Sequence, residues 1–151
     1  MKKSPVREIG FFGPDRKPFK IHLTDAGRRD PLTASFGTQE PLEVFHLHAE
    51  TVELTNEMKL LGRGEFCENQ IVRIGERAYG LQGHFELTRE MLEVWAAEDP
   101  DLQTLRISDL KEGFAAVGTA FREAARRLLS NFLAISPTSR KLRSGTPGNV
   151  L

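Results

Sequence analysis

The residues GLQGHFELT, 80–88, contain a histidine and a glutamate two positions apart, His84 and Glu86. On an extended segment, residues i and i+2 point to the same side, so the carboxylate of Glu86 can bind one imidazole nitrogen of His84. The other nitrogen then stays available to a reacting group. This is the pairing of a general base with an orienting carboxylate in nucleophilic triads. A polar strand end without catalytic function would carry the same two residues.

A second group of reactive side chains lies in FHLHAE, 45–50. Period-two alternation predicts that His46, His48 and Glu50 share one face of a strand. Imidazoles and carboxylates are side chains that bind zinc, so these three residues are a candidate metal site, with His84 as a further, more distant ligand. A solvated strand face is the competing interpretation. His22 has no partner at a suggestive spacing, so we expect it to be structural or solvent-facing.

The elements that must position these residues are short strands followed by two helices. Extended segments are expected at 7–13, 19–24 and 41–54, and apolar runs on both sides of Gly75-Glu76-Arg77 predict an antiparallel hairpin. Thr88 is a candidate N-cap for a helix that ends at Asp99-Pro100. From Ser108 onward one apolar stripe predicts a second helix; its members are Leu110, Phe114, Val117, Phe121, Ala125, Leu128 and Phe132.

Length and charge restrict the class of protein. The 151 residues suit one domain, expected over 1–135, and the polar, basic stretch 136–151 is expected to be a disordered tail. Lys plus Arg and Asp plus Glu are both 21, which argues against nucleic acid or an anionic membrane as a partner. No leader peptide and no run long enough to span a bilayer is recognisable, so we expect a cytoplasmic protein.

Four segments taken in order resemble a known family. REIGFF, LTDAGRRDPL, VFHLHAETVEL and LLGRGEFCENQIVRIGERAYGLQGHFELTREMLEVW, roughly residues 6–97, resemble the C-terminal half of class I glutamine amidotransferases, particularly the GMP-synthase-like stand-alone members. That family carries a Gln-Phe-His-Pro-Glu-like signature, preceded by an Asn-Gln pair that Asn69-Gln70 matches here. The resemblance implies part of an α/β, flavodoxin-like sandwich with mixed or antiparallel strands and two C-terminal helices.

The resemblance also implies a reaction, the release of ammonia from glutamine by a Cys-His-Glu triad without a cofactor or a metal. His84 would move the proton and Glu86 would orient the imidazole, while His48, Glu50 and Gln82 would flank the glutamine pocket. Two positions depart from the signature. Gly83 stands where an aromatic residue is usual and is expected to loosen the backbone, and Phe85 stands where proline is usual and leaves φ unrestrained.

The largest departure concerns the nucleophile. The family's cysteine sits in an elbow, a Gly-x-Cys-x-Gly turn between a strand and a helix, and the 151 residues contain no such elbow. The single cysteine, Cys67, is expected to be a small buried residue that forms no internal disulfide. We therefore expect the C-terminal portion of an amidotransferase-like domain, inactive alone, that a second polypeptide completes or that self-associates. The alternatives are a non-catalytic binding or regulatory module and a histidine-rich metal-binding β protein.

Overall fold

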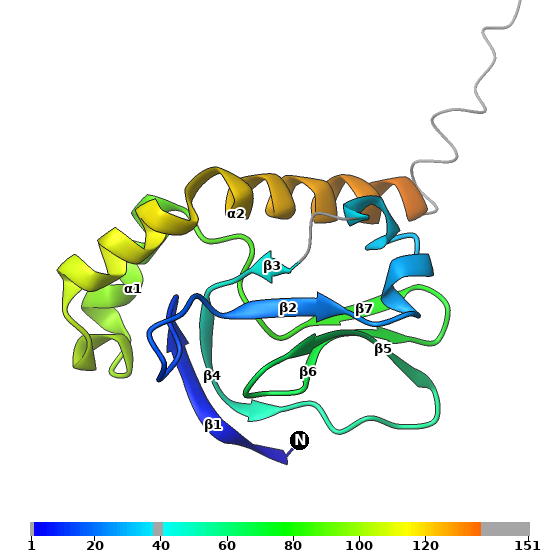
Figure 1. Cartoon of the computed structure of the whole chain (residues 1–151), viewed down its shortest axis with the longest axis horizontal. Coiled ribbons are helices and arrows are strands. Elements are labelled where there is room, and N and C mark those ends of the chain that lie inside the picture. The colour runs from blue at the N-terminus through cyan, green and yellow to red at the C-terminus, as the bar shows by residue number, and fades with distance from the viewer. Residues whose placement is uncertain (1, 38–40, 137–151) are drawn as a thin grey trace, which may run out of the picture.

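The structure, a computed structural model, describes residues 2–37 and 41–136 (Figure 1). Within them β1 pairs with β4 in a two-stranded sheet, and a five-stranded sheet has the order β3-β2-β5-β6-β7, with every ladder antiparallel. The strands are β1 (Lys2–Gly10), β2 (Lys20–Leu23), β3 (Leu42–Glu43), β4 (His46–Thr51), β5 (Met58–Gly64), β6 (Asn69–Ile74) and β7 (Ala78–Leu81). The helices are α1 (Arg89–Glu98), α2 (Ile107–Ile135) and three 3-10 helices, η1 (Gly27–Arg29), η2 (Ala34–Phe36) and η3 (Leu102–Thr104).

The predicted hairpin between β6 and β7 is confirmed. Its turn contains Gly75 at a φ of 56°, a left-handed conformation that glycine adopts without the steric cost of a Cβ. The single extended segment expected over 41–54 is instead two strands in different sheets, because β3 pairs with β2 and β4 pairs with β1. Val44 and Phe45, which join β3 to β4, are fully buried, so the chain changes sheets inside the core.

Both predicted helices are present. Thr88 caps α1, since its Oγ1 accepts a hydrogen bond from the Met91 amide at 3.2 Å, and the helix ends at Glu98, immediately before Asp99. α2 buries Leu110, Val117, Phe121 and Leu128 of its predicted stripe and leaves Phe132 exposed. The helix is interrupted at Gly118, where φ is 40° and ψ is −117°. No helix in the described part of the chain combines the length and apolar composition that crossing a membrane requires.

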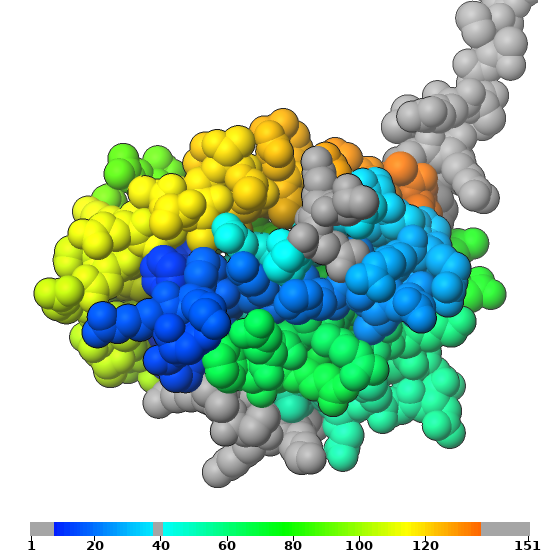
Figure 2. All heavy atoms as spheres, in the orientation of Figure 1, coloured from blue at the N-terminus to red at the C-terminus, as the bar shows by residue number. Residues whose placement is uncertain are grey.

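The core lies between α2 and the strands. Phe11 is at its centre, with ring centroids 4.8 Å from Phe45, 6.0 Å from Phe114 and 6.3 Å from Phe121. The C-terminal part of α2 packs against the segment that holds η1 and η2 (Figure 2), where the Asn131 side-chain amide donates to the Leu32 carbonyl at 2.7 Å. Apart from Ser136, the tail expected over 136–151 lies outside the described residues.

Candidate active site

His84 and Glu86 lie between β7 and α1, in a segment held by neighbouring backbone. The His84 amide donates to the Phe45 carbonyl at 2.8 Å, and the Gln82 amide donates to the Gln70 carbonyl at 2.8 Å. The His84 Nδ1 is 2.7 Å from the Glu86 Oε1. The expected contact between the two side chains is therefore present, although the segment around them is bent and His84 forms only an isolated bridge with Phe45.

The His84 ring is partly enclosed. Its centroid lies 5.1 Å from that of Trp95 on α1 and 6.4 Å from that of Phe45, both with edge-to-face geometry. The side chain of His84 is 32% exposed and that of Glu86 is 57% exposed. With Nδ1–H donating to Glu86, Nε2 carries the lone pair, and the described residues provide no partner for it. The pair can therefore accept a proton from a group that approaches from solvent.

The two residues that depart from the family signature are both packed. An added Cβ at Gly83 would lie 2.2 Å from the Val44 Cγ2 and 3.1 Å from the His46 Cε1, and the φ of this glycine is not positive. Close packing, rather than backbone freedom, is thus the structural reason for glycine at position 83. Phe85 is 6% exposed, and its ring stacks on that of Phe121 at 6.3 Å.

An open groove of about 1590 Å³ lies beside the His84–Glu86 pair. One wall is the segment from β7 to the start of α1, including His84 and Glu86, and the other wall is α2. Phe114, Leu129 and Phe132 give the helical wall an apolar surface, so a second segment with an apolar face could lie against this wall of the groove.

No thiol of this chain reaches that groove. Cys67, the only cysteine of the sequence, lies in the connection between β5 and β6 and is fully buried. Its carbonyl accepts a hydrogen bond from the Gln70 side-chain amide at 3.0 Å, and Cys67 is not among the residues that line the groove. Its surroundings are those of a structural residue.

Of the three residues expected to flank a glutamine pocket, none lines this groove. His48 is nearly buried between β1 and β4, and Glu50 is exposed. Gln82 is partly buried, and its Oε1 has no hydrogen-bond partner among the described residues. Their contribution to substrate binding stays a prediction.

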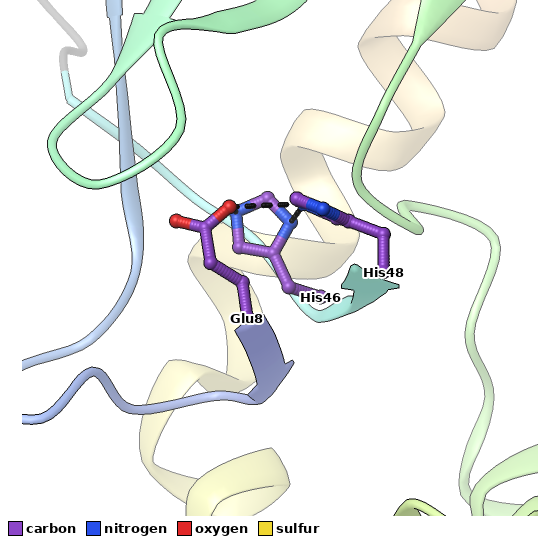
Figure 3. Close-up of side chains that lie close together, drawn as sticks. All are labelled: Glu8, His46 and His48. Carbon is purple, nitrogen blue, oxygen red and sulfur yellow. Dashed lines mark hydrogen bonds and ion pairs between the residues drawn. The ribbon is translucent and has the colours of Figure 1, made fainter. Parts of the chain in front are cut away.

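His46 and His48 do share one face of β4, and their side chains converge with Glu8 of β1 (Figure 3). The His48 Nε2 is 2.9 Å from the Glu8 Oε2 and 3.2 Å from the His46 Nδ1. Glu50, which the alternation pattern placed with these histidines, does not belong to the cluster, because it is exposed near the end of β4. The carboxylate that joins the two histidines is that of Glu8, which lies opposite His48 in the β1–β4 ladder. Burial, together with smaller contributions from the nearby His48 and His84, lowers the pKa of His46 to about 3, so His46 is neutral at neutral pH.

A second buried polar cluster, which the sequence did not single out, lies where β6 and β7 meet the η1–η2 segment. Asp30 is buried and accepts hydrogen bonds from Arg73 at 2.9 Å and from the Tyr79 hydroxyl at 3.1 Å. Burial raises the pKa of Tyr79, and the adjacent Asp30 carboxylate raises it further. Tyr79 also lines the groove, so this cluster fixes one end of its strand wall.

In sequence the chain is similar to a glutamine amidotransferase-like protein, and its fold is that of solved glutamine amidotransferases, part of a flavodoxin-like sandwich. The chain is 42% identical to the glutamine amidotransferase-like protein YfeJ of Salmonella typhimurium (strain LT2) over 91 aligned residues. These aligned residues make up 60% of this chain and 34% of YfeJ. No protein-family model matches the chain.

Solved structures share its fold. SMU.1228c superposes with a TM-score of 0.68 at 25% identity, over 88% of this chain and 53% of its own. A glutamine amidotransferase from Thermotoga maritima superposes with a TM-score of 0.68 at 21% identity, over 87% of this chain and 53% of its own. A glutamine amidotransferase from Methylobacillus flagellatus superposes with a TM-score of 0.59 at 19% identity, over 86% of this chain and 55% of its own. The chain thus spans about a third of the length of YfeJ and about half of each solved structure.

Proposed function

We propose that this chain supplies the base and the orienting carboxylate of a Cys-His-Glu triad that hydrolyses the side-chain amide of glutamine. The observation that carries the proposal is the 2.7 Å contact between the His84 Nδ1 and the Glu86 Oε1 at the edge of an open groove. The contact holds the imidazole in the tautomer whose Nε2 can take a proton. Similarity to glutamine amidotransferase-like proteins supports glutamine as the substrate.

In the proposed reaction the His84 Nε2 takes the proton of a cysteine thiol, and the thiolate attacks the amide carbon of glutamine. The tetrahedral intermediate collapses as the imidazolium gives that proton to the leaving nitrogen, which departs as ammonia and leaves a thioester. His84 then removes a proton from water, the hydroxide cleaves the thioester to glutamate, and the proton returns to the thiolate. Glu86 stabilises each imidazolium stage.

The thiol comes from an elbow outside these 151 residues, whether in the same polypeptide or in another one. Cys67 is buried away from the groove and cannot supply it. The apolar wall of α2 suits a packed secondary-structure element, and an elbow on that element would bring its cysteine beside the His84 Nε2. The 151-residue chain alone is then inactive on glutamine.

Ammonia release tests this proposal. The chain alone should release none above background, whereas a hybrid in which the chain is fused behind an elbow-bearing segment of a glutamine amidotransferase should hydrolyse glutamine. In that hybrid His84→Gln should lower kcat roughly a thousandfold or more, because removing one triad member removes most of the covalent catalysis. His22→Gln, on an exposed residue of β2, is the matched control and should leave kcat unchanged.

Two results would contradict the proposal. One is turnover by the 151-residue chain near a normal kcat of ~10 per second. The other is a folded, active hybrid in which His84→Gln keeps full activity, because the base would then lie elsewhere.

The groove also favours a second candidate function, a non-catalytic module that binds a partner polypeptide. Its helical wall exposes apolar side chains at Phe114, Leu129 and Phe132, which suits protein contact whether or not a reaction follows. A partner that lacks a cysteine near His84, or a complex that releases no ammonia, would favour this candidate over the enzyme.

A further inference from the structure

We propose that Glu8, His46 and His48 form a binding site for one zinc ion, separate from the His84–Glu86 pair. Each of the three residues offers one ligand atom, and these atoms all lie within 4.8 Å of one another. Figure 3 shows the carboxylate and the two imidazoles pointing toward one another from β1 and β4. The cluster is a property of the tertiary structure, since Glu8 lies far from both histidines in the sequence.

The ligand types select the metal. Two imidazoles and one carboxylate form a ligand set found in zinc sites, whereas Ca²⁺ and Mg²⁺ prefer oxygen ligands throughout. Zinc bonds to nitrogen and oxygen of ~2.0–2.2 Å in a tetrahedral arrangement require ligand atoms roughly 3.3–3.6 Å apart. The Glu8 Oε2 is 2.9 Å from the His48 Nε2, which is 3.2 Å from the His46 Nδ1, so small side-chain movements would admit the ion.

The backbone already holds the three ligands in place. β1 and β4 are paired, with Glu8 opposite His48 and Gly10 opposite His46 in the ladder. The Gln70 side-chain amide donates to the Glu8 Oε2 at 3.1 Å, which orients the carboxylate from the larger sheet. Ligands held in this way lose little further conformational freedom when the ion binds.

The three ligand side chains are buried, so an ion bound to them would affect the stability of the folded chain. The side chains of Glu8 and His46 are each 1% exposed and that of His48 is 7% exposed. Burying a carboxylate is costly unless it is paired and hydrogen-bonded, and a divalent cation would pair with it directly. A bound zinc ion would link β1 to β4 beside Gly83 and raise the thermal stability of the chain.

Zinc titration of the full 151-residue chain, stripped with a chelator and followed by calorimetry and elemental analysis, tests the proposal. We expect one retained zinc per chain and a Tm that rises with zinc. Glu8→Gln and His48→Gln should each raise the Kd by roughly a hundredfold or more. The matched controls are Glu50→Gln on the same strand and His22→Gln, and both should bind zinc as the unaltered chain does.

His84→Gln separates this site from the candidate active site and should also leave zinc binding unchanged. Because Glu8→Gln or His48→Gln could fail to fold, nitrogen NMR of the unaltered chain provides a second measurement. Zinc should shift the ring nitrogens of His46 and His48 and leave those of His22 unmoved. The proposal is overturned if the chain retains no zinc, if His84→Gln abolishes binding, or if the His46 and His48 rings do not respond to saturating zinc.

Discussion

At the scale of single residues, the His84–Glu86 contact depends on buried neighbours. Phe85, between them, points into the core and stacks on Phe121, so the residues on either side of it face the opposite way, toward the groove. On the other side of His84, Gly83 packs against Val44 and His46. The two residues that depart from the family signature thus belong to the packing that positions the pair.

Gly83→Ala should lower the free energy of unfolding by roughly 1–3 kcal/mol, the usual cost of forcing a methyl group into a packed site. The added Cβ would lie 2.2 Å from the Val44 Cγ2 and 3.1 Å from the His46 Cε1. Urea unfolding measures the loss. The double variant Gly83→Ala/Val44→Ala is the control: alanine at 44 removes the clashing atom, so Gly83→Ala should cost less there. An equal cost in both backgrounds would refute the steric explanation.

Tyr79 should ionise above its usual pKa of 10.0, because burial and the Asp30 carboxylate both disfavour the phenolate. It is the only tyrosine, so near-ultraviolet absorbance in an alkaline titration follows this residue alone. Since the pKa is higher in the folded than in the unfolded chain, this contribution to stability is complete below pH 10.0 and is lost as pH rises through the folded-state pKa. Asp30→Asn should move the midpoint down, and an unmoved midpoint would exclude the charge effect.

At the scale of elements, local sequence predicts what local interactions determine. The stripe of α2, the cap at Thr88 and the turn at Gly75 depend on residues a few positions apart. The cap and the turn are confirmed, and the stripe is buried except at Phe132 and, in part, at Phe114 and Ala125. The approach of Glu8 to His48 was not predictable, because it depends on the register of β1 against β4, which is irregular between Lys3 and Glu8. The change of sheet at Val44 was hidden for a related reason, since the alternation of 41–54 also fits one continuous strand.

The N-cap of α1 can be tested directly. Thr88→Ala should lower the free energy of unfolding by about 1 kcal/mol, because the Met91 amide loses the Oγ1 acceptor at 3.2 Å. α1 also carries Trp95, whose ring contacts that of His84, so fraying of the helix should change the Trp95 fluorescence. Thr88→Ser keeps the acceptor and is the matched control in thermal unfolding. If serine destabilised as much as alanine, the hydrogen bond would not be the cause.

Gly118 interrupts α2 at a conformation that other residues rarely adopt, with φ at 40° and ψ at −117°. Beyond its chain neighbours and the adjacent helix backbone, no atom of the described residues lies within 4 Å of an added Cβ, so contact with other elements is not the obstacle. We expect Gly118→Ala to cost roughly 1–3 kcal/mol through backbone strain alone. Urea unfolding and the helical circular dichroism signal together test this expectation. An alanine variant of unchanged stability and greater helix content would mean that α2 can straighten without penalty.

At the scale of the whole molecule, the groove leaves apolar surface exposed along the C-terminal half of α2. Leu129 is 59% exposed and Phe132 is 44% exposed, and both line the groove with the more buried Phe121 and Leu128. Exposed apolar residues that lie together along one groove can be buried together by one partner, whereas the same residues scattered singly cannot. The chain should therefore associate through this helix, with a second copy in the absence of another polypeptide.

Leu129→Lys should weaken that association, because the new ammonium group would have to lose its hydration when the contact forms. Analytical ultracentrifugation over a range of concentrations should show reversible self-association of the unaltered chain and a shift toward monomer in the variant. Val94→Lys is the matched control: Val94 on α1 is 52% exposed but does not line the groove, so its replacement should leave the association unchanged. A sharp monomer with a cooperative melt at all concentrations would show that the exposed face of α2 needs no partner, and would weaken the case for an elbow-bearing segment packing there.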